Sequence, residues 1–74
     1  MQIHEKLRGL REDHDLSQSD YGHFFNMGQK KISRIENGTQ AITTDELKAF
    51  CQFWNVSADW LLGLPDGLPY PKRK

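Results

Sequence analysis

The segment from Gln18 to Asn37 constrains the fold more than any other part of the chain, because two short apolar patterns follow each other almost directly. Tyr21, Phe24 and Phe25 form the apolar side of the first pattern. Ile32 and Ile35 recur at helical spacing in the second. Two helices joined by a turn of about three to four residues cross each other and bury their facing sides together. The sequence therefore predicts a crossed helix pair.

Two residues in this segment suit a tight crossing. Asn26 lies between the two patterns, and asparagine is among the few residues other than glycine that tolerate a left-handed backbone. Gly22 lies where the helices would touch, near the apolar Met27. As a mere weak point of its helix, Gly22 would cost about 0.5–1 kcal/mol relative to alanine. Its position opposite the helix that carries Ile32 and Ile35 instead favours the interpretation that Gly22 allows the two helices to pack closely.

Start and stop signals define the first three helices. A first helix of about three turns is predicted from three apolar residues at helical spacing: Ile3, Leu7 and Leu10. Ser17 is a suitable N-cap for the next helix, which we expect to end near Phe25. We expect the third helix to run roughly from Gly28 to Asn37, since Asn37-Gly38 is a common way to end a helix.

Two further helices follow. Thr43 and Glu46 have the spacing of a capping box. The apolar residues that follow it are Leu47, Phe50, Cys51 and Trp54. Ser57 would cap a last short helix through Leu62, and the prolines and glycines from Pro65 onward forbid further regular structure. We therefore predict an all-α domain of five helices over residues 1–64 and a mobile basic tail over residues 65–74.

The chain has 74 residues, which allows one compact domain but not a second core. Cys51 is the single cysteine, so an internal disulfide cannot form and a reducing compartment fits best. No apolar run has the length of a membrane span or of a signal peptide. We therefore expect a cytoplasmic protein that does not enter a membrane.

The chain is formally neutral, but its charges are unevenly distributed. Residues 27–41 carry three basic and one acidic side chain, and residues 67–74 carry three basic and no acidic ones. The other segments are acidic, with five acidic against three basic side chains over 1–26 and four against one over 42–66. This distribution is expected of a docking face for nucleic acid on an otherwise neutral protein. Chance clustering in a short chain explains the charges alone about equally well.

The outward side of the predicted helix 28–37 is polar or basic before Glu36. It carries Gln29, Lys30, Lys31, Ser33 and Arg34. Glutamine can bind adenine through its amide, while lysine and arginine can donate to guanine, and only the major groove distinguishes these base pairs. The helix N-terminus adds partial positive charge towards phosphate. A basic helix face alone is more often simply solvated, but its coupling to the crossed pair favours DNA recognition.

The sequence resembles the phage Cro and repressor-type helix-turn-helix proteins, also called XRE-like, over nearly all of its predicted helices. The resemblance rests on the crossed pair together with residues 16–18 (LSQ), 32–38 (ISRIENG) and 57–63 (SADWLLG). It implies a five-helix, lambda-repressor-like DNA-binding domain that inserts helix 28–37 into the major groove. The implied function is that of a sequence-specific transcriptional regulator, with repression favoured over activation.

The resemblance also implies roles for individual residues. The predicted base contacts are Gln29, Lys30, Ser33 and Arg34. The predicted contacts with the DNA backbone are Gln18, Lys31, Asn37, Gln40 and Thr43. Gln18 would in addition steady Gln29. The chain departs from the family pattern at Asn26, where glycine is usual, and at Gly28, where the usual side-chain cap is missing.

Other chemistry finds little support in the sequence. The histidines, His4, His14 and His23, are not three or four residues apart on one helix, so we expect no metal site. Asp13, Asp15 and Asp20 lie at predicted helix ends, where local electrostatics explains acidic residues without catalysis. We therefore expect neither enzymatic activity nor a cofactor or small-molecule ligand.

The run from Trp60 to Leu64 is more apolar than a two-turn helix can bury, which predicts an association surface. We expect a homodimer with Trp60, Leu61 and Leu64 in its interface, although the first two could instead close the core, as we expect of Trp54. A dimer would hold two helices 28–37 about 34 Å apart on a near-palindromic operator in double-stranded DNA.

The rival hypothesis is a protein-interaction module of the same fold, antitoxin-like or antagonist, without DNA recognition. The neutral net charge favours this rival, and the basic side of helix 28–37 counts against it.

Overall fold

The computed structural model of the protein describes residues 2–64 and consists there of five α-helices without strands. The helices are α1 (Ile3–Asp13), α2 (Gln18–Phe24), α3 (Gln29–Glu36), α4 (Thr44–Trp54) and α5 (Ala58–Leu62). The prediction of an all-α, five-helix domain is confirmed. The predicted mobile tail lies outside the described residues.

The predicted helix ends agree with the observed ones because the capping residues act as expected. The Ser17, Thr43 and Ser57 side chains each accept a hydrogen bond from the backbone N–H three residues on. At the end of α3, Gly38 has a φ of 76° and donates its N–H to the Ile35 carbonyl, while Thr39 donates to that of Arg34. These two bonds satisfy carbonyls that the end of a helix leaves free.

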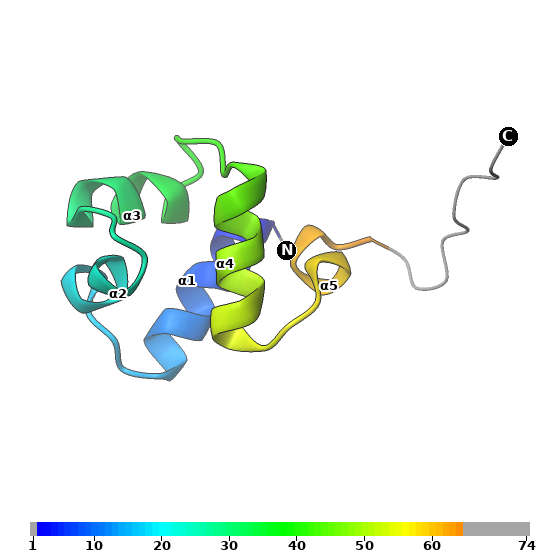
Figure 1. Cartoon of the computed structure of the whole chain (residues 1–74), viewed down its shortest axis with the longest axis horizontal. Helices are drawn as coiled ribbons and strands as arrows, with labels where there is room; N and C mark the ends of the chain where they lie inside the picture. The colour runs from blue at the N-terminus through cyan, green and yellow to red at the C-terminus, as the bar shows by residue number, and fades with distance from the viewer. Residues whose placement is uncertain (1, 65–74) are drawn as a thin grey trace, which may run out of the picture.

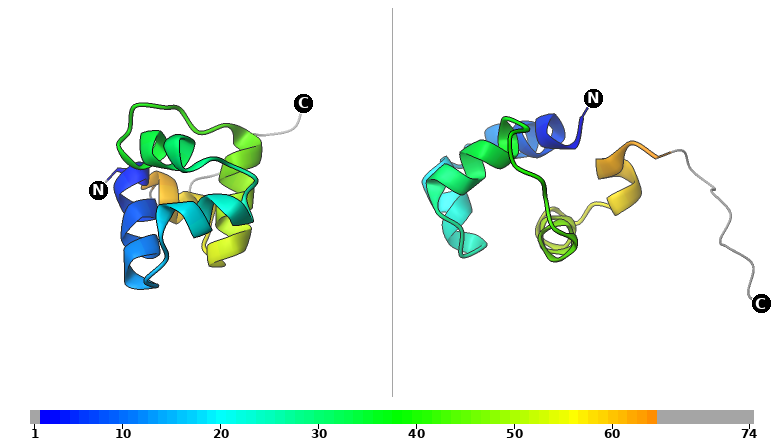
Figure 2. Two further views of the ribbon diagram at one scale, coloured as in Figure 1. Left: turned by 90° about the vertical axis from the view of Figure 1, so that its left-hand side faces the viewer. Right: turned by 90° about the horizontal axis from the view of Figure 1, so that it is seen from above.

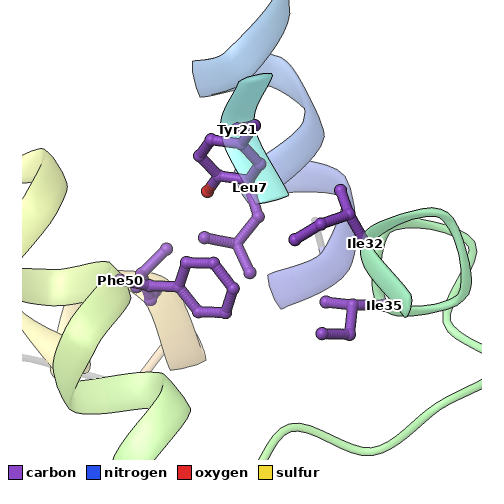
Figure 3. Close-up of a cluster of buried hydrophobic side chains, with 6 residues drawn as sticks. Leu7, Tyr21, Ile32, Ile35 and Phe50 are labelled. Atoms are coloured by element: carbon purple, nitrogen blue, oxygen red, sulfur yellow. The ribbon is translucent and has the colours of Figure 1, made fainter. Parts of the chain in front are cut away.

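Every helix contributes at least one side chain to a single core, of which Figure 3 shows a close-up. The fully buried residues are Leu7, Tyr21, Ile32, Ile35, Phe50 and Leu61. Trp54 packs against this core and donates its indole N–H to the Tyr21 hydroxyl over 2.8 Å. Burial raises the pKa of Tyr21, so that its hydroxyl stays protonated.

The helices are arranged so that α3 lies on the outside of the domain. The crossed pair α2 and α3 forms the end of the domain opposite α5, and α1 and α4 pass between these ends (Figure 1). The segment between α3 and α4 runs along the outside next to α3 (Figure 2). Within residues 2–64 no helix is both long and apolar enough to cross a membrane.

Three predictions about individual side chains at the core need correction or refinement. Leu61 was expected in a dimer interface, but it is fully buried in the core and cannot contact a second chain. Phe24 was expected on the apolar side of its helix, yet it is 61% exposed because α2 turns Tyr21 and Gly22 inwards instead. Trp60, for which both core and interface were considered, is 47% exposed.

Candidate nucleic-acid interface

The outer side of α3 is polar, as the sequence pattern predicts. Ile32 and Ile35 are buried in the core and thereby fix which side of the helix faces outwards. Gln29, Lys30 and Arg34 are exposed, and Ser33 is half-buried. Three of the four predicted base contacts are thus exposed on one helix, whose apolar side packs on the core.

The start of α3 follows a tight turn. Asn26 has a φ of 57°, which confirms the predicted left-handed turn residue. A Cβ atom on Gly22 would lie 2.5 Å from the Met27 carbonyl oxygen and 3.2 Å from the Ile32 side chain. The prediction that Gly22 permits close packing is therefore confirmed, since any larger residue would push the turn away from α2.

Gly28 is the N-cap of α3 and provides no side-chain hydrogen bond to it. The first backbone N–H groups of a helix have no acceptor within the helix itself. At α3 they meet no capping side chain, so they add partial positive charge next to Gln29 and Lys30. An anion that approaches this end of α3 therefore encounters the partial positive charge of the backbone N–H groups and the full charge of Lys30.

The other end of α3 is fixed by a buried ion pair that sequence reasoning missed. Glu36 is 3% exposed, and its carboxylate accepts hydrogen bonds from Arg11 over 2.8, 3.0 and 3.1 Å. Gln18 also donates to Glu36, over 3.2 Å. The sequence holds a signal for this contact, because an acidic residue in the last turn of a helix opposes the helix dipole unless a cation compensates it.

This network changes the expectation for Gln18. We expected its side chain to steady Gln29, whereas in the structure it donates to Glu36. Gln18 therefore connects the start of α2 to the end of α3 instead of supporting the start of α3. Its side chain is half-buried at this position.

The segment after α3 carries the remaining predicted backbone contacts. Asn37 is the exposed C-cap of α3, with its amide nitrogen 3.5 Å from the Ser33 hydroxyl. Gln40 is half-buried and Thr43 is exposed. The Thr43 hydroxyl oxygen accepts the Glu46 N–H over 3.1 Å, which leaves the hydroxyl proton free for another acceptor.

Lys31 differs from its neighbours on α3. Its ammonium lies 2.6 Å from Glu46 of α4, and the side chains of Lys31 and Glu46 are 39% and 12% exposed. The predicted phosphate contact of Lys31 therefore requires that this ion pair open or be shared.

Two groups of exposed apolar side chains lie on helices other than α3 or directly after the end of one. Phe24 of α2 and Phe53 of α4 pack against each other with their ring centroids 5.2 Å apart and their planes tilted by 46°, and they are 61% and 38% exposed. At α5, Leu64 is 44% exposed, and the exposed Trp60 ring has the Lys6 ammonium 4.8 Å from its centroid. We call these the Phe24–Phe53 patch and the Trp60–Leu64 patch.

Comparison with known proteins agrees with this architecture. The chain is 34% identical over 55 residues to Antitoxin PezA of Streptococcus pneumoniae serotype 4 (strain ATCC BAA-334 / TIGR4), which covers 74% of this chain and 35% of that protein. The chain thus matches about a third of the length of this relative. A family model described as helix-turn-helix matches residues 7–61, from the middle of α1 into α5. The chain therefore belongs to the XRE-like helix-turn-helix family of DNA-binding regulators.

Proposed function

We propose that this protein regulates transcription by binding a near-palindromic operator sequence-specifically, most simply as a repressor that occludes a promoter in the cytoplasm. The observation that carries the proposal is the outer side of α3, where Gln29, Lys30 and Arg34 are exposed while Ile32 and Ile35 hold the helix on the core. Such a helix fits the width of the major groove, where side chains of these types distinguish base pairs.

The other predicted side chains fall into two classes, those that contact bases and those that contact phosphates. Ser33 joins the three exposed residues of α3 in contacting bases. Asn37, Gln40 and Thr43 contact phosphates from the segment that runs beside α3, and Gln18 contacts one from the start of α2. Contacts to phosphate position the domain on DNA, and contacts to base edges give sequence preference.

We further propose that the operator-bound form is a homodimer that associates through the Trp60–Leu64 patch. The exposure of Trp60 and Leu64 supports this, and Leu61 plays no part because it is buried. Two copies related by a two-fold axis present their α3 helices to successive major grooves about 34 Å apart. A single domain of this size has too small an interface for typical operator affinity.

The proposal is tested by selecting DNA from a pool of random duplexes and then titrating the selected duplex against a scrambled one at two salt concentrations. We expect one enriched near-palindromic sequence and a preference of about 10³-fold or more over the scrambled duplex. Binding to both duplexes should weaken as salt increases, because phosphate contacts release counterions. Equal affinity for selected and scrambled duplexes would contradict sequence-specific binding.

A second candidate function is binding of a protein partner, as an antitoxin does. Two observations favour it, namely the similarity to Antitoxin PezA and the exposed Phe24–Phe53 patch. An apolar patch outside the proposed DNA interface allows a partner to bind without displacing DNA. Replacing Phe24 by serine should then abolish capture of a partner and leave DNA affinity unchanged. Arg34→Ala should weaken DNA binding and leave capture of the partner unchanged.

A further inference from the structure

Glu46 occupies a position that connects the recognition helix α3 to the start of α4. Its carboxylate lies 2.6 Å from the Lys31 ammonium and accepts the Thr43 backbone N–H over 3.0 Å. The Thr43 hydroxyl in turn accepts the Glu46 N–H, which completes a capping box. One carboxylate thus holds both a basic residue of α3 and the residue at which α4 begins.

The burial of this contact distinguishes it from an ordinary surface pair. The Glu46 side chain is only 12% exposed and that of Lys31 39%, compared with 54% for each partner of the Arg8–Glu12 pair on α1. The Lys31 ammonium and the Thr43 N–H lower the pKa of Glu46, so the carboxylate is charged at neutral pH. Without Lys31, this negative charge would face any phosphate that approaches Thr43.

We propose that Glu46 is a positioning residue for DNA binding and that Lys31 acts in this internal pair instead of as a phosphate contact. This inference rests on the proposed DNA-binding function. Lys31 neutralises the carboxylate next to Thr43, and the pair fixes the distance between α3 and the start of α4. The two groups that approach DNA, the outer side of α3 and the Thr43 hydroxyl, are thereby kept in register.

The salt dependence of DNA binding separates this role from a direct phosphate contact. Each phosphate neutralised by a side chain contributes about 0.9 to the slope of log affinity against log salt concentration. If Lys31 is occupied by Glu46, Lys31→Met weakens binding but leaves this slope unchanged. In a Glu46→Gln background Lys31 is released towards phosphate, so there the same substitution lowers the slope by about 0.9.

Glu46→Gln suits this test because a glutamine oxygen can still accept the Thr43 N–H and preserve the capping box. We expect it to raise affinity for a scrambled duplex up to about fivefold at low salt, because one cation is released. Asp45→Asn is the matched control, since it removes a neighbouring exposed acid that is in none of the ion pairs found within residues 2–64. In the Asp45→Asn background, Lys31→Met should act as it does in the wild type.

Equal effects of Lys31→Met on the slope in the wild-type and Glu46→Gln backgrounds would overturn the proposal. A measurement without DNA makes the pair visible independently, since NMR titration should show the Glu46 pKa rising towards its ordinary value in Lys31→Met. Failure of the wild-type protein to bind any duplex would overturn the proposed function itself, and the titration would still report whether the pair exists. Urea unfolding of each variant checks that it is folded.

Discussion

Arg11, in the last turn of α1, binds both carboxylate oxygens of Glu36, the last residue of α3, with its Nε atom 2.8 Å from Oε2 and its Nη2 atom 3.0 Å from Oε1. The Nη1 atom of the same guanidinium donates to the Leu16 carbonyl over 2.8 Å, in the connection between α1 and α2. Arg11 therefore fixes α3 and the approach to α2 at once. The half-buried Arg11 side chain thus helps to set the orientation of the crossed pair.

Arg11→Met should therefore destabilise the domain strongly. It leaves the Glu36 carboxylate buried without a cation, and breaking a buried ion pair in this way costs about 3–5 kcal/mol in the free energy of unfolding. Urea unfolding followed by circular dichroism measures the loss. Arg8→Met is the matched control on the same helix, since its pair with Glu12 is half exposed and should be worth less than about 1 kcal/mol. Similar losses in the two variants would show that the Arg11–Glu36 pair does not hold the fold together.

Gly22→Ala should also destabilise the domain, although alanine is the better helix former. The added methyl would meet the Met27 carbonyl oxygen at 2.5 Å, and backbone can relieve such a contact only by moving the turn. We expect a loss of about 1–3 kcal/mol, the usual range for overpacking. Gly9→Ala on α1 meets nothing within 4 Å and should stabilise by about 0.5–1 kcal/mol. Thermal unfolding of the two variants should therefore give shifts of opposite sign.

The helices and their ends could be predicted from the sequence because local signals determine them. Ser17, Thr43 and Ser57 are caps that act within three residues, and Asn26 and Gly38 suit the left-handed backbone wherever they occur. The spacing of the apolar residues predicted which side of each helix faces the core. Tyr21, Phe24 and Phe25 share one side of the helix by spacing, but the core meets α2 at Tyr21 and Gly22, with Phe25 packed against it. Phe24 therefore lies at the edge of the buried side, which the spacing alone does not show.

The contacts between side chains distant in sequence could not be predicted in the same way. Arg11 and Glu36 are separated by 25 positions and Lys31 and Glu46 by 15, so their meeting depends on the angles between helices. In the sequence, Lys31 was assigned to a phosphate contact and Glu46 to a capping box, and nothing in either pattern paired them. Leu61 was misassigned for a related reason, since apolar spacing within a helix of five residues does not show which residue points inwards.

Gln29→Ala and Arg34→Ala should each weaken binding to the selected operator by about 1–3 kcal/mol and change affinity for a scrambled duplex much less. Both side chains are exposed on α3, so neither change should alter the stability of the free domain by more than about 0.5 kcal/mol. Fluorescence titration with the two duplexes measures the difference. Lys48→Ala, which removes an exposed cation from α4, serves as the control with no change in preference. Unchanged operator preference in both α3 variants would exclude α3 as the recognition helix.

Leu64→Glu should abolish cooperative operator binding, because it places a charge in the Trp60–Leu64 patch proposed as the dimer interface. Leu64 is 44% exposed, so the substitution leaves the core intact. The patch is small, and we expect the free wild-type dimer to dissociate with a constant on the order of 1 µM. Phe24→Glu is the matched control, since it places the same charge at a more exposed aromatic residue of the Phe24–Phe53 patch.

Sedimentation of each protein with and without a palindromic duplex decides between the two stoichiometries. We expect two wild-type chains to bind one duplex cooperatively, and we expect the same of Phe24→Glu. The Leu64→Glu variant should bind the two half-sites independently and with the affinity of a single domain, because the α3 surface is unchanged. One wild-type chain per duplex at saturation would contradict the dimer. Loss of cooperativity in Phe24→Glu with retention in Leu64→Glu would instead place the interface at the Phe24–Phe53 patch.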